Sequence, residues 1–121
     1  MILPNIETFI GCESSFEEAS IVLYGAPFDS TTSFRPGARF GPSAMRHESF
    51  GLETYSPYQD KDLIDISVFD SGDLELCSGS SEMALSDIQK RAEEILKAGK
   101  FPLLLGGEHL VTLGAVRAAA A

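Results

Sequence analysis

The stretch Leu103-Leu104-Leu105-Gly106-Gly107-Glu108-His109 decides how this sequence is interpreted. It is an apolar run that ends in two glycines, an acid and a histidine, and the residues from Leu110 onward are mostly apolar or strong helix formers. A strand, a glycine turn and a helix are therefore predicted. Open α/β sheets bind ligands where such strands end. His109 is a candidate ligand residue, and the alternative is a histidine that finishes the strand and bonds a neighbouring carbonyl.

Two more strands are predicted upstream. Residues 21–25 are a short apolar run of strand formers, and residues 65–69 alternate and are rich in β-branched side chains. Residues 70–73, Asp-Ser-Gly-Asp, are interpreted as the exit turn of the second strand. With residues 102–106 as the third strand, the spacing leaves room for a helix between successive strands.

Two helices are predicted between the strands. Pro42 begins a short one that continues over residues 43–47. Apolar residues at helical spacing predict a longer helix from Ser80 or Ser81 to Ala98. Alternating strands and helices favour an α/β fold with a parallel sheet.

Composition and charge exclude several classes of function. The 121 residues carry a formal net charge of −9, which disfavours binding to nucleic acid. No apolar run approaches the roughly 18–20 residues that span a bilayer, and residues 1–11 have no basic segment typical of a secretory signal. Cys12 and Cys77 lie in no paired motif and are interpreted as free thiols. We expect a cytoplasmic protein that binds neither nucleic acid nor membrane.

Four motifs occur in order along the chain: GAPFD at residues 25–29, RPGARFGP at 35–42 with Arg46 after it, DSGDL at 70–74, and GGEH at 106–109. In order and spacing they resemble the ureohydrolase family, which includes arginase and agmatinase. The RPGARFGP loop looks most like the agmatinase branch. Four motifs together are a specific signal, whereas each one alone would be weak.

The resemblance implies a three-layer α/β/α sandwich with a parallel sheet, the arginase-like fold. Residues 1–121 are then the amino-terminal part of a single arginase-like domain. Combined with the alternating pattern, the resemblance predicts three parallel strands with the 21–25 strand between the other two. It also implies a homo-oligomer, a trimer or a hexamer.

The same resemblance implies a site with two Mn²⁺ ions that activate a water molecule for attack on a guanidinium carbon. His109 matches a metal ligand of the family. Glu108 is interpreted as a carboxylate that supports the ligand or the fold, with Gly106, Gly107 and Asp29 near the site. The implied reaction is the hydrolysis of agmatine to putrescine and urea. The alternatives are another guanidino substrate, guanidinobutyrate or arginine, or a non-catalytic fragment.

Most of the implied metal site is missing from this sequence. The family supplies its other ligands from later motifs, and residues 110–121 contain no Asp, Glu or His. We assign no catalytic residue within the chain and expect it to be inactive by itself. Leu103, Leu104 and Leu105 would then line an exposed apolar sheet edge, so we expect these residues not to fold alone into a stable monomer. The terminal residues 118–121 are either true alanines or unidentified side chains.

Five other residues attract attention and have simpler interpretations. Arg35 and Arg39 either pair with a carboxylate of their own loop or of a neighbouring subunit, or belong to a solvated loop. Asp70 and Asp73 are interpreted as turn formers whose side chains bond nearby backbone amides. His47, in the short helix, is given no chemical role.

Overall fold

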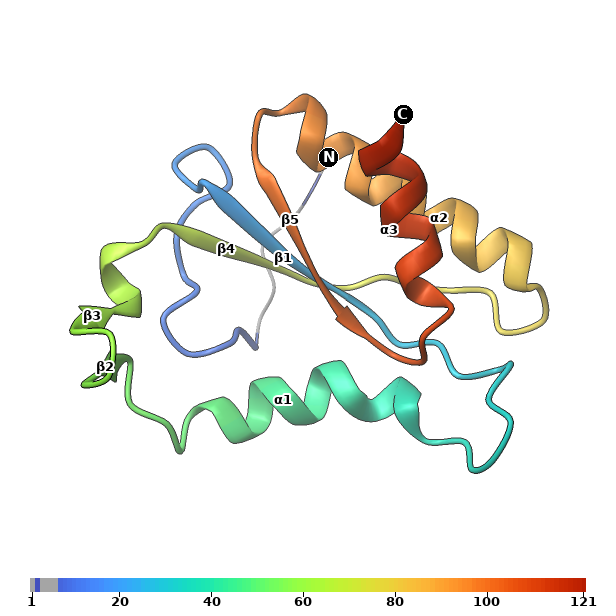
Figure 1. The fold of residues 1–121 in the computed structure, drawn as a ribbon, viewed down its shortest axis with the longest axis horizontal. Helices are drawn as coiled ribbons and strands as arrows, with labels where there is room; N and C mark the ends of the chain where they lie inside the picture. Colours follow the sequence, from blue (N-terminus) through green and yellow to red (C-terminus); the bar gives the residue numbers. More distant parts are fainter. Residues whose placement is uncertain (1, 3–6) are drawn as a thin grey trace.

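The chain is built around a short parallel sheet. The computed structural model describes Ile2 and residues 7–121. The sheet consists of β1 (Ile21–Ala26), β4 (Val68–Asp73) and β5 (Phe101–Gly106). β1 lies in the centre and pairs in parallel with both neighbours (Figure 1). The predicted order, with the first strand between the other two, is confirmed.

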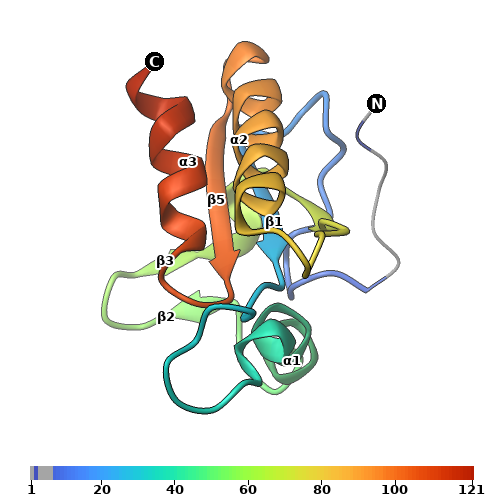
Figure 2. The same ribbon diagram turned by 90° about the vertical axis from the view of Figure 1, so that its right-hand side faces the viewer.

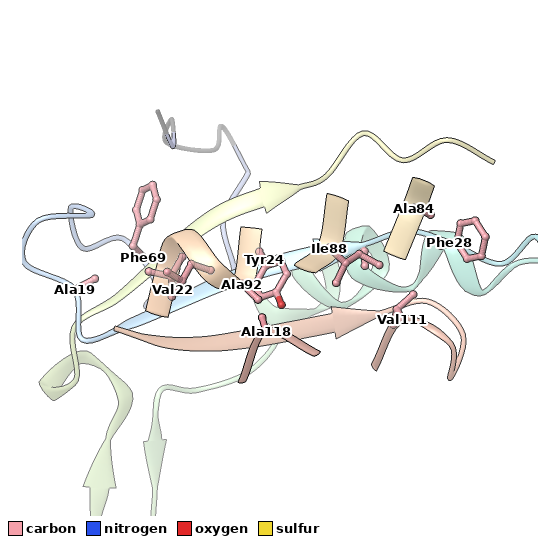
Figure 3. Close-up of a cluster of buried hydrophobic side chains, with 12 residues drawn as sticks. Ala19, Val22, Tyr24, Phe28, Phe69, Ala84, Ile88, Ala92, Val111 and Ala118 are labelled. Carbon is pink, nitrogen blue, oxygen red and sulfur yellow. The ribbon is translucent and has the colours of Figure 1, made fainter. Parts of the chain in front are cut away.

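Two helices cover one face of the sheet. α2 (Ser81–Lys97) and α3 (Val111–Ala120) lie side by side over it (Figures 1 and 2). Alternate residues of β1 point towards these helices. The buried residues that pack together there include Val22, Tyr24, Ala26, Ala84, Ile88, Ala92, Ile95, Val111 and Ala118 (Figure 3). Gly114 allows α3 to approach α2 closely, because a Cβ there would lie 2.9 Å from the Cβ of Ile88.

The ends of α2 follow from local chemistry. The Ser80 hydroxyl accepts a hydrogen bond from the Met83 amide at 3.2 Å and so caps the first turn. Gly99 adopts a φ of 75° just beyond the helix, a conformation that glycine accepts without steric cost. Among the helices of the described residues, none combines the length and apolar character needed to cross a membrane.

The opposite face of the sheet carries α1 (Gly41–Ser49) and part of the segment before β1 (Figure 1). A smaller apolar cluster lies here and contains Cys12, Leu23 and Val68, with Phe9, Ile21, Leu63 and Leu105 against it. Cys12 is a buried core side chain, and burial raises the pKa of its thiol to about 11. The sheet therefore lies between two helical layers, which confirms the expected α/β/α architecture.

β5 forms one edge of the sheet. Within the described part of the chain it pairs with β1 alone. Leu103 is 43% exposed, and Leu104 and Leu105 are half-buried. The expectation of an apolar edge along these leucines is confirmed for the described residues.

The second strand begins and ends later than predicted. The pattern predicts a strand at residues 65–69 and a turn at residues 70–73, and the structure corrects both. A 3-10 helix, η2 (Leu63–Asp65), begins after Asp62, whose side chain caps it. β4 then runs through the whole DSGD sequence. The local turn chemistry of these residues is overridden by tertiary contacts.

Three short elements lie in segments for which no period was found. β2 (Tyr55–Ser56) and β3 (Lys61–Asp62) form a small antiparallel hairpin. A 3-10 helix, η1 (Ala38–Phe40), leads into α1.

The carboxylates of Asp70 and Asp73 bind Arg46, which corrects their interpretation as turn formers. Arg46 donates from Nε to Asp70 at 2.8 Å, from Nη2 to Asp70 at 3.0 Å, and from Nη1 to Asp73. Arg46 is 3% exposed and Asp70 is 1% exposed. Burial by itself would lower the pKa of Arg46, but the hydrogen bonds and charges of the two carboxylates outweigh burial and raise it.

This buried ionic cluster joins three parts of the fold. Asp70 also accepts hydrogen bonds from the backbone amides of Phe9 at 2.8 Å and Gly72 at 2.9 Å. The second of these is a local amide bond of the kind expected from the sequence. Gly25 in β1 makes room for the cluster, because a Cβ there would overlap the Asp73 carboxylate. α1, β4 and the segment before β1 are therefore held by one set of charges.

Replacing Arg46 with Met should destabilise the full protein by about 3–5 kcal/mol, because Asp70 would remain buried without its counter-charge. Equilibrium denaturation in urea measures the effect. Arg117→Met is the matched control, since Arg117 pairs with Glu82 at 3.8 Å between exposed side chains. That variant should lose less than about 1 kcal/mol. Equal losses for the two variants would contradict the role given to the buried cluster.

Candidate functional site

The carboxyl ends of β1 and β5 meet at one end of the sheet. β1 continues into a loop over residues 27–37, and β5 continues into a turn over residues 107–110 (Figure 2). The Glu108 amide donates a hydrogen bond of 3.0 Å to the carbonyl of Phe28. The two segments are far apart in sequence, and this bond places them side by side.

Gly107 is required at this junction. Its φ is 50°, and a Cβ would overlap the carbonyl of Ala26 and lie 2.8 Å from that of Phe28. Gly106 is tightly packed as well, because a Cβ there would lie 3.1 Å from a methyl group of Val111. Both glycines therefore serve to allow close backbone packing at this junction.

Glu108 ties the turn to the loop after β1. Its Oε1 accepts hydrogen bonds from the Thr31 amide at 3.1 Å and from the Thr31 hydroxyl. One carboxylate oxygen thus receives two donors from one loop residue. This geometry is that of a carboxylate that supports the fold next to His109.

Asp29 holds the other end of the same loop. Its carboxylate accepts from the amides of Gly37 at 2.6 Å and Arg39 at 3.2 Å, and from Arg39 Nη1 at 3.5 Å. The hydrogen bond from the Gly37 amide is the main reason that the pKa of Asp29 is lowered, so the group stays ionised. The segment between Asp29 and Gly37 is therefore fixed at both ends, with its middle residues left at the surface.

His109 lies in a cleft between this loop and the beginning of α3. The cleft has a volume of about 640 Å³ and is lined by Thr31, Thr32, Ser33, Phe34, Arg35, Glu108, His109, Leu110 and Leu113. A second hollow of about 260 Å³ lies on the β5 side of the same turn, and His109 borders it too. The side chain is exposed, and no hydrogen bond or ion pair of the described residues engages its imidazole. Its ring nitrogens are therefore available to a ligand.

His109 is not accompanied by a ready metal site. The described residues contain no group of three or more His, Cys, Asp or Glu side chains that could hold a metal ion. The nearest carboxylate along the chain, Glu108, is engaged by Thr31. The described part of the chain therefore contains no complete metal site around His109.

The remaining predicted residues separate into different regions. Arg39 pairs with Asp29, which is one of its two predicted alternatives, a carboxylate of its own loop. Arg35 lines the cleft of His109 and has its guanidinium 5.2 Å from the centre of the Phe34 ring. His47 lies exposed on α1, with Nδ1 3.9 Å from the Glu7 carboxylate.

Thr31 and Phe34 are among the residues of the cleft that were not singled out from the sequence. Both occur in the DSTTSFRPG segment, which has no period and is interpreted only as a loop. The available signal was a run of four hydroxyl side chains, residues 30–33, and an aromatic residue between Asp29 and the RPG turn. Thr31 and Phe34 line the cleft because Asp29 and Glu108 fix the loop, and these long-range contacts are visible only in the structure.

Comparison with known proteins gives one consistent family. The model of the Arginase family matches residues 19–121. The agmatinase of Bacillus subtilis (strain 168) is 48% identical over 112 residues, a match that covers 93% of this chain and 39% of that protein.

Solved structures agree with this match. The agmatine ureohydrolase of Thermoplasma volcanium superposes with a TM-score of 0.88 at 33% identity, over 94% of this chain and 39% of that one. The proclavaminate amidinohydrolase of Streptomyces clavuligerus gives a TM-score of 0.83 at 34% identity, over 96% and 40% of the two chains. The chain spans about two fifths of the length of these relatives.

Replacing Thr31 with Val should loosen the loop after β1, because the hydroxyl that donates to the Glu108 carboxylate is lost while the side-chain shape is kept. Hydrogen bonds to charged groups contribute about 1.5–3 kcal/mol. Amide hydrogen exchange of the full protein, followed by mass spectrometry, should therefore be at least about tenfold faster over residues 30–36.

Thr112→Val is the control for this substitution. Thr112 is exposed in the first turn of α3, and its side chain makes no hydrogen bond within the described residues. Its replacement should leave exchange in the loop unchanged. Equal protection of residues 30–36 in Thr31→Val and the unmodified protein would show that the Glu108 contact does not hold the loop.

Proposed function

The chain belongs to the Arginase family, and from this premise we propose that it is part of an agmatinase-type ureohydrolase. In this proposal the full protein hydrolyses agmatine to putrescine and urea. The identity of 48% to the Bacillus subtilis agmatinase supports the choice of branch. The observation that carries the proposal is the position of His109, exposed in a cleft at the carboxyl ends of β1 and β5.

We propose further that the full protein holds two Mn²⁺ ions and that His109 is one of their ligands. The neutral imidazole of histidine is a common metal ligand, and the His109 ring is exposed beside the cleft. The described residues fit one ligand position and not a complete site. When bound, a metal pair would supply a nucleophilic water at neutral pH for attack on the guanidinium carbon.

The residues of this chain would position the reacting groups. Glu108 fixes the loop that faces His109, and Gly107 brings that loop against the end of β5. Leu110 and Leu113 provide an apolar wall to the cleft, which reduces the access of water to a bound substrate. Orientation of this kind lowers the entropic part of a reaction barrier.

A guanidino substrate with a carboxylate tail, such as guanidinobutyrate or arginine, is the second candidate. Arg35 lines the same cleft and forms no ion pair among the described residues. A free guanidinium recognises carboxylates well. The acidic net charge of −9 and the similarity to agmatinases favour the cationic substrate.

The location and assembly of the protein belong to the same proposal. We place it in the cytoplasm, as a homo-oligomer. Large apolar side chains at the surface near the beginning of α1, such as Phe40 and Met45, support a subunit contact there. Burying such apolar side chains in an interface removes their unfavourable contact with water.

Replacing His109 with Ala in the full protein should lower its manganese content and its rate of urea release together, because one metal ligand is lost. Metal content is measured by inductively coupled plasma mass spectrometry. His47→Ala is the matched control, because His47 is also exposed and lies on α1 outside the cleft. Unchanged manganese in the His109 variant would contradict its assignment as a ligand.

A further inference from the structure

The loop between Asp29 and Gly37 presents an aromatic ring to the cleft of His109. Phe34 is 83% exposed, although burial of such a side chain would be favourable by about 1.5–3 kcal/mol. The loop is fixed at Asp29 and at Thr31, and its residues 33–36 lie at the surface. The sequence thus keeps a large apolar group at the wall of the cleft.

The ring of Phe34 already binds a cation in the structure. The Arg35 guanidinium lies 5.2 Å from the ring centre, within the range of a cation–π contact. Arg35 has no carboxylate partner among the described residues, so the ring is its main contact there. In the structure, one face of the ring is therefore open to a positive group.

We propose that the Phe34 ring is a cation-binding subsite for the ammonium end of an amino-guanidine substrate. The inference rests on the proposed function, in which the guanidinium end lies near His109. Both residues line one cleft, which places the two proposed contacts in the same site. The ammonium group takes the position that the Arg35 guanidinium occupies when no substrate is bound.

This subsite would select the substrate class by the charge of its tail. An ammonium tail gains attraction from the ring face, whereas a methyl tail of the same size gains only apolar contact and a carboxylate tail gains nothing from the ring. Agmatine would be preferred over pentylguanidine, which replaces the terminal ammonium with a methyl group. The preference should appear in KM, since the ring acts far from the bond that breaks.

Steady-state kinetics of the full manganese-loaded protein test the proposal. Phe34→Leu keeps an apolar side chain and removes the ring, so the KM for agmatine should rise about three- to tenfold, with kcat retained. The KM for pentylguanidine should not change. Phe34→Tyr, which keeps a ring, should restore the KM for agmatine. Phe50→Leu is the matched control, because Phe50 is another exposed phenylalanine outside the cleft.

Two kinetic results would overturn the proposal. An unchanged KM for agmatine in Phe34→Leu would show that the ring binds no cation of the substrate. An equal rise for agmatine and pentylguanidine would show that Phe34 is an apolar wall without charge preference. Arg35→Gln adds an independent arm. Loss of the competing guanidinium should lower the KM for agmatine, whereas a raised KM for guanidinobutyrate would identify Arg35 itself as the group that recognises the tail.

A binding measurement separates this inference from the proposed function. Isothermal titration calorimetry with 1,4-diaminobutane, a diammonium compound without a guanidinium group, requires no turnover. Phe34→Leu should weaken its binding, and Phe50→Leu should not. If the unmodified protein releases no urea from agmatine but the calorimetric difference is found, the proposed function fails and the cation subsite stands. Equal binding by the two variants would overturn the subsite.

Discussion

The close approach of two backbones at Gly107 is the constraint on which the candidate site depends. β1 and β5 run in parallel, so their carboxyl ends lie together, and the turn after β5 passes against Ala26 and Phe28 without room for a Cβ. The Glu108 amide and carboxylate then attach the loop after β1 to this turn. His109 is the next residue and faces the cleft that results. The site is thus a consequence of strand pairing and one residue without a side chain.

A second constraint acts on the opposite face of the sheet. The buried guanidinium of Arg46, on α1, forms ion pairs with Asp70 and Asp73 of β4. Such a cluster adds little net stability compared with apolar packing. Removing one partner is nevertheless strongly destabilising, because the other charge is then buried without a counter-charge. Asp70 also accepts a hydrogen bond from the Phe9 amide, so the same cluster holds the segment before β1 in place. The apolar core under α2 and α3 supplies most of the burial, and the ionic cluster sets where α1 lies.

The parts of the fold that were predictable are those with local causes. β1, β5 and α2 follow from apolar runs, helical spacing and caps such as Ser80, and the order of the strands followed from the motifs. β4 was misplaced because Asp70 and Asp73 carry turn chemistry locally, and their partner Arg46 lies 24 and 27 residues away. His109 was recognisable from its place after a strand and a glycine turn. Phe34 was not, because a loop without period gives no sign of which side chain its fixed ends will expose.

The central proposal is that His109, in the turn after β5, binds a metal ion in the cleft bounded by the loop after β1. Anomalous X-ray diffraction at the manganese absorption edge, from crystals of the full protein grown with Mn²⁺, tests it most directly. We predict an anomalous peak within coordination distance of an imidazole nitrogen of His109, with the Glu108 carboxylate still bound to Thr31. A manganese peak elsewhere in the protein, with the His109 ring unligated, would contradict the account.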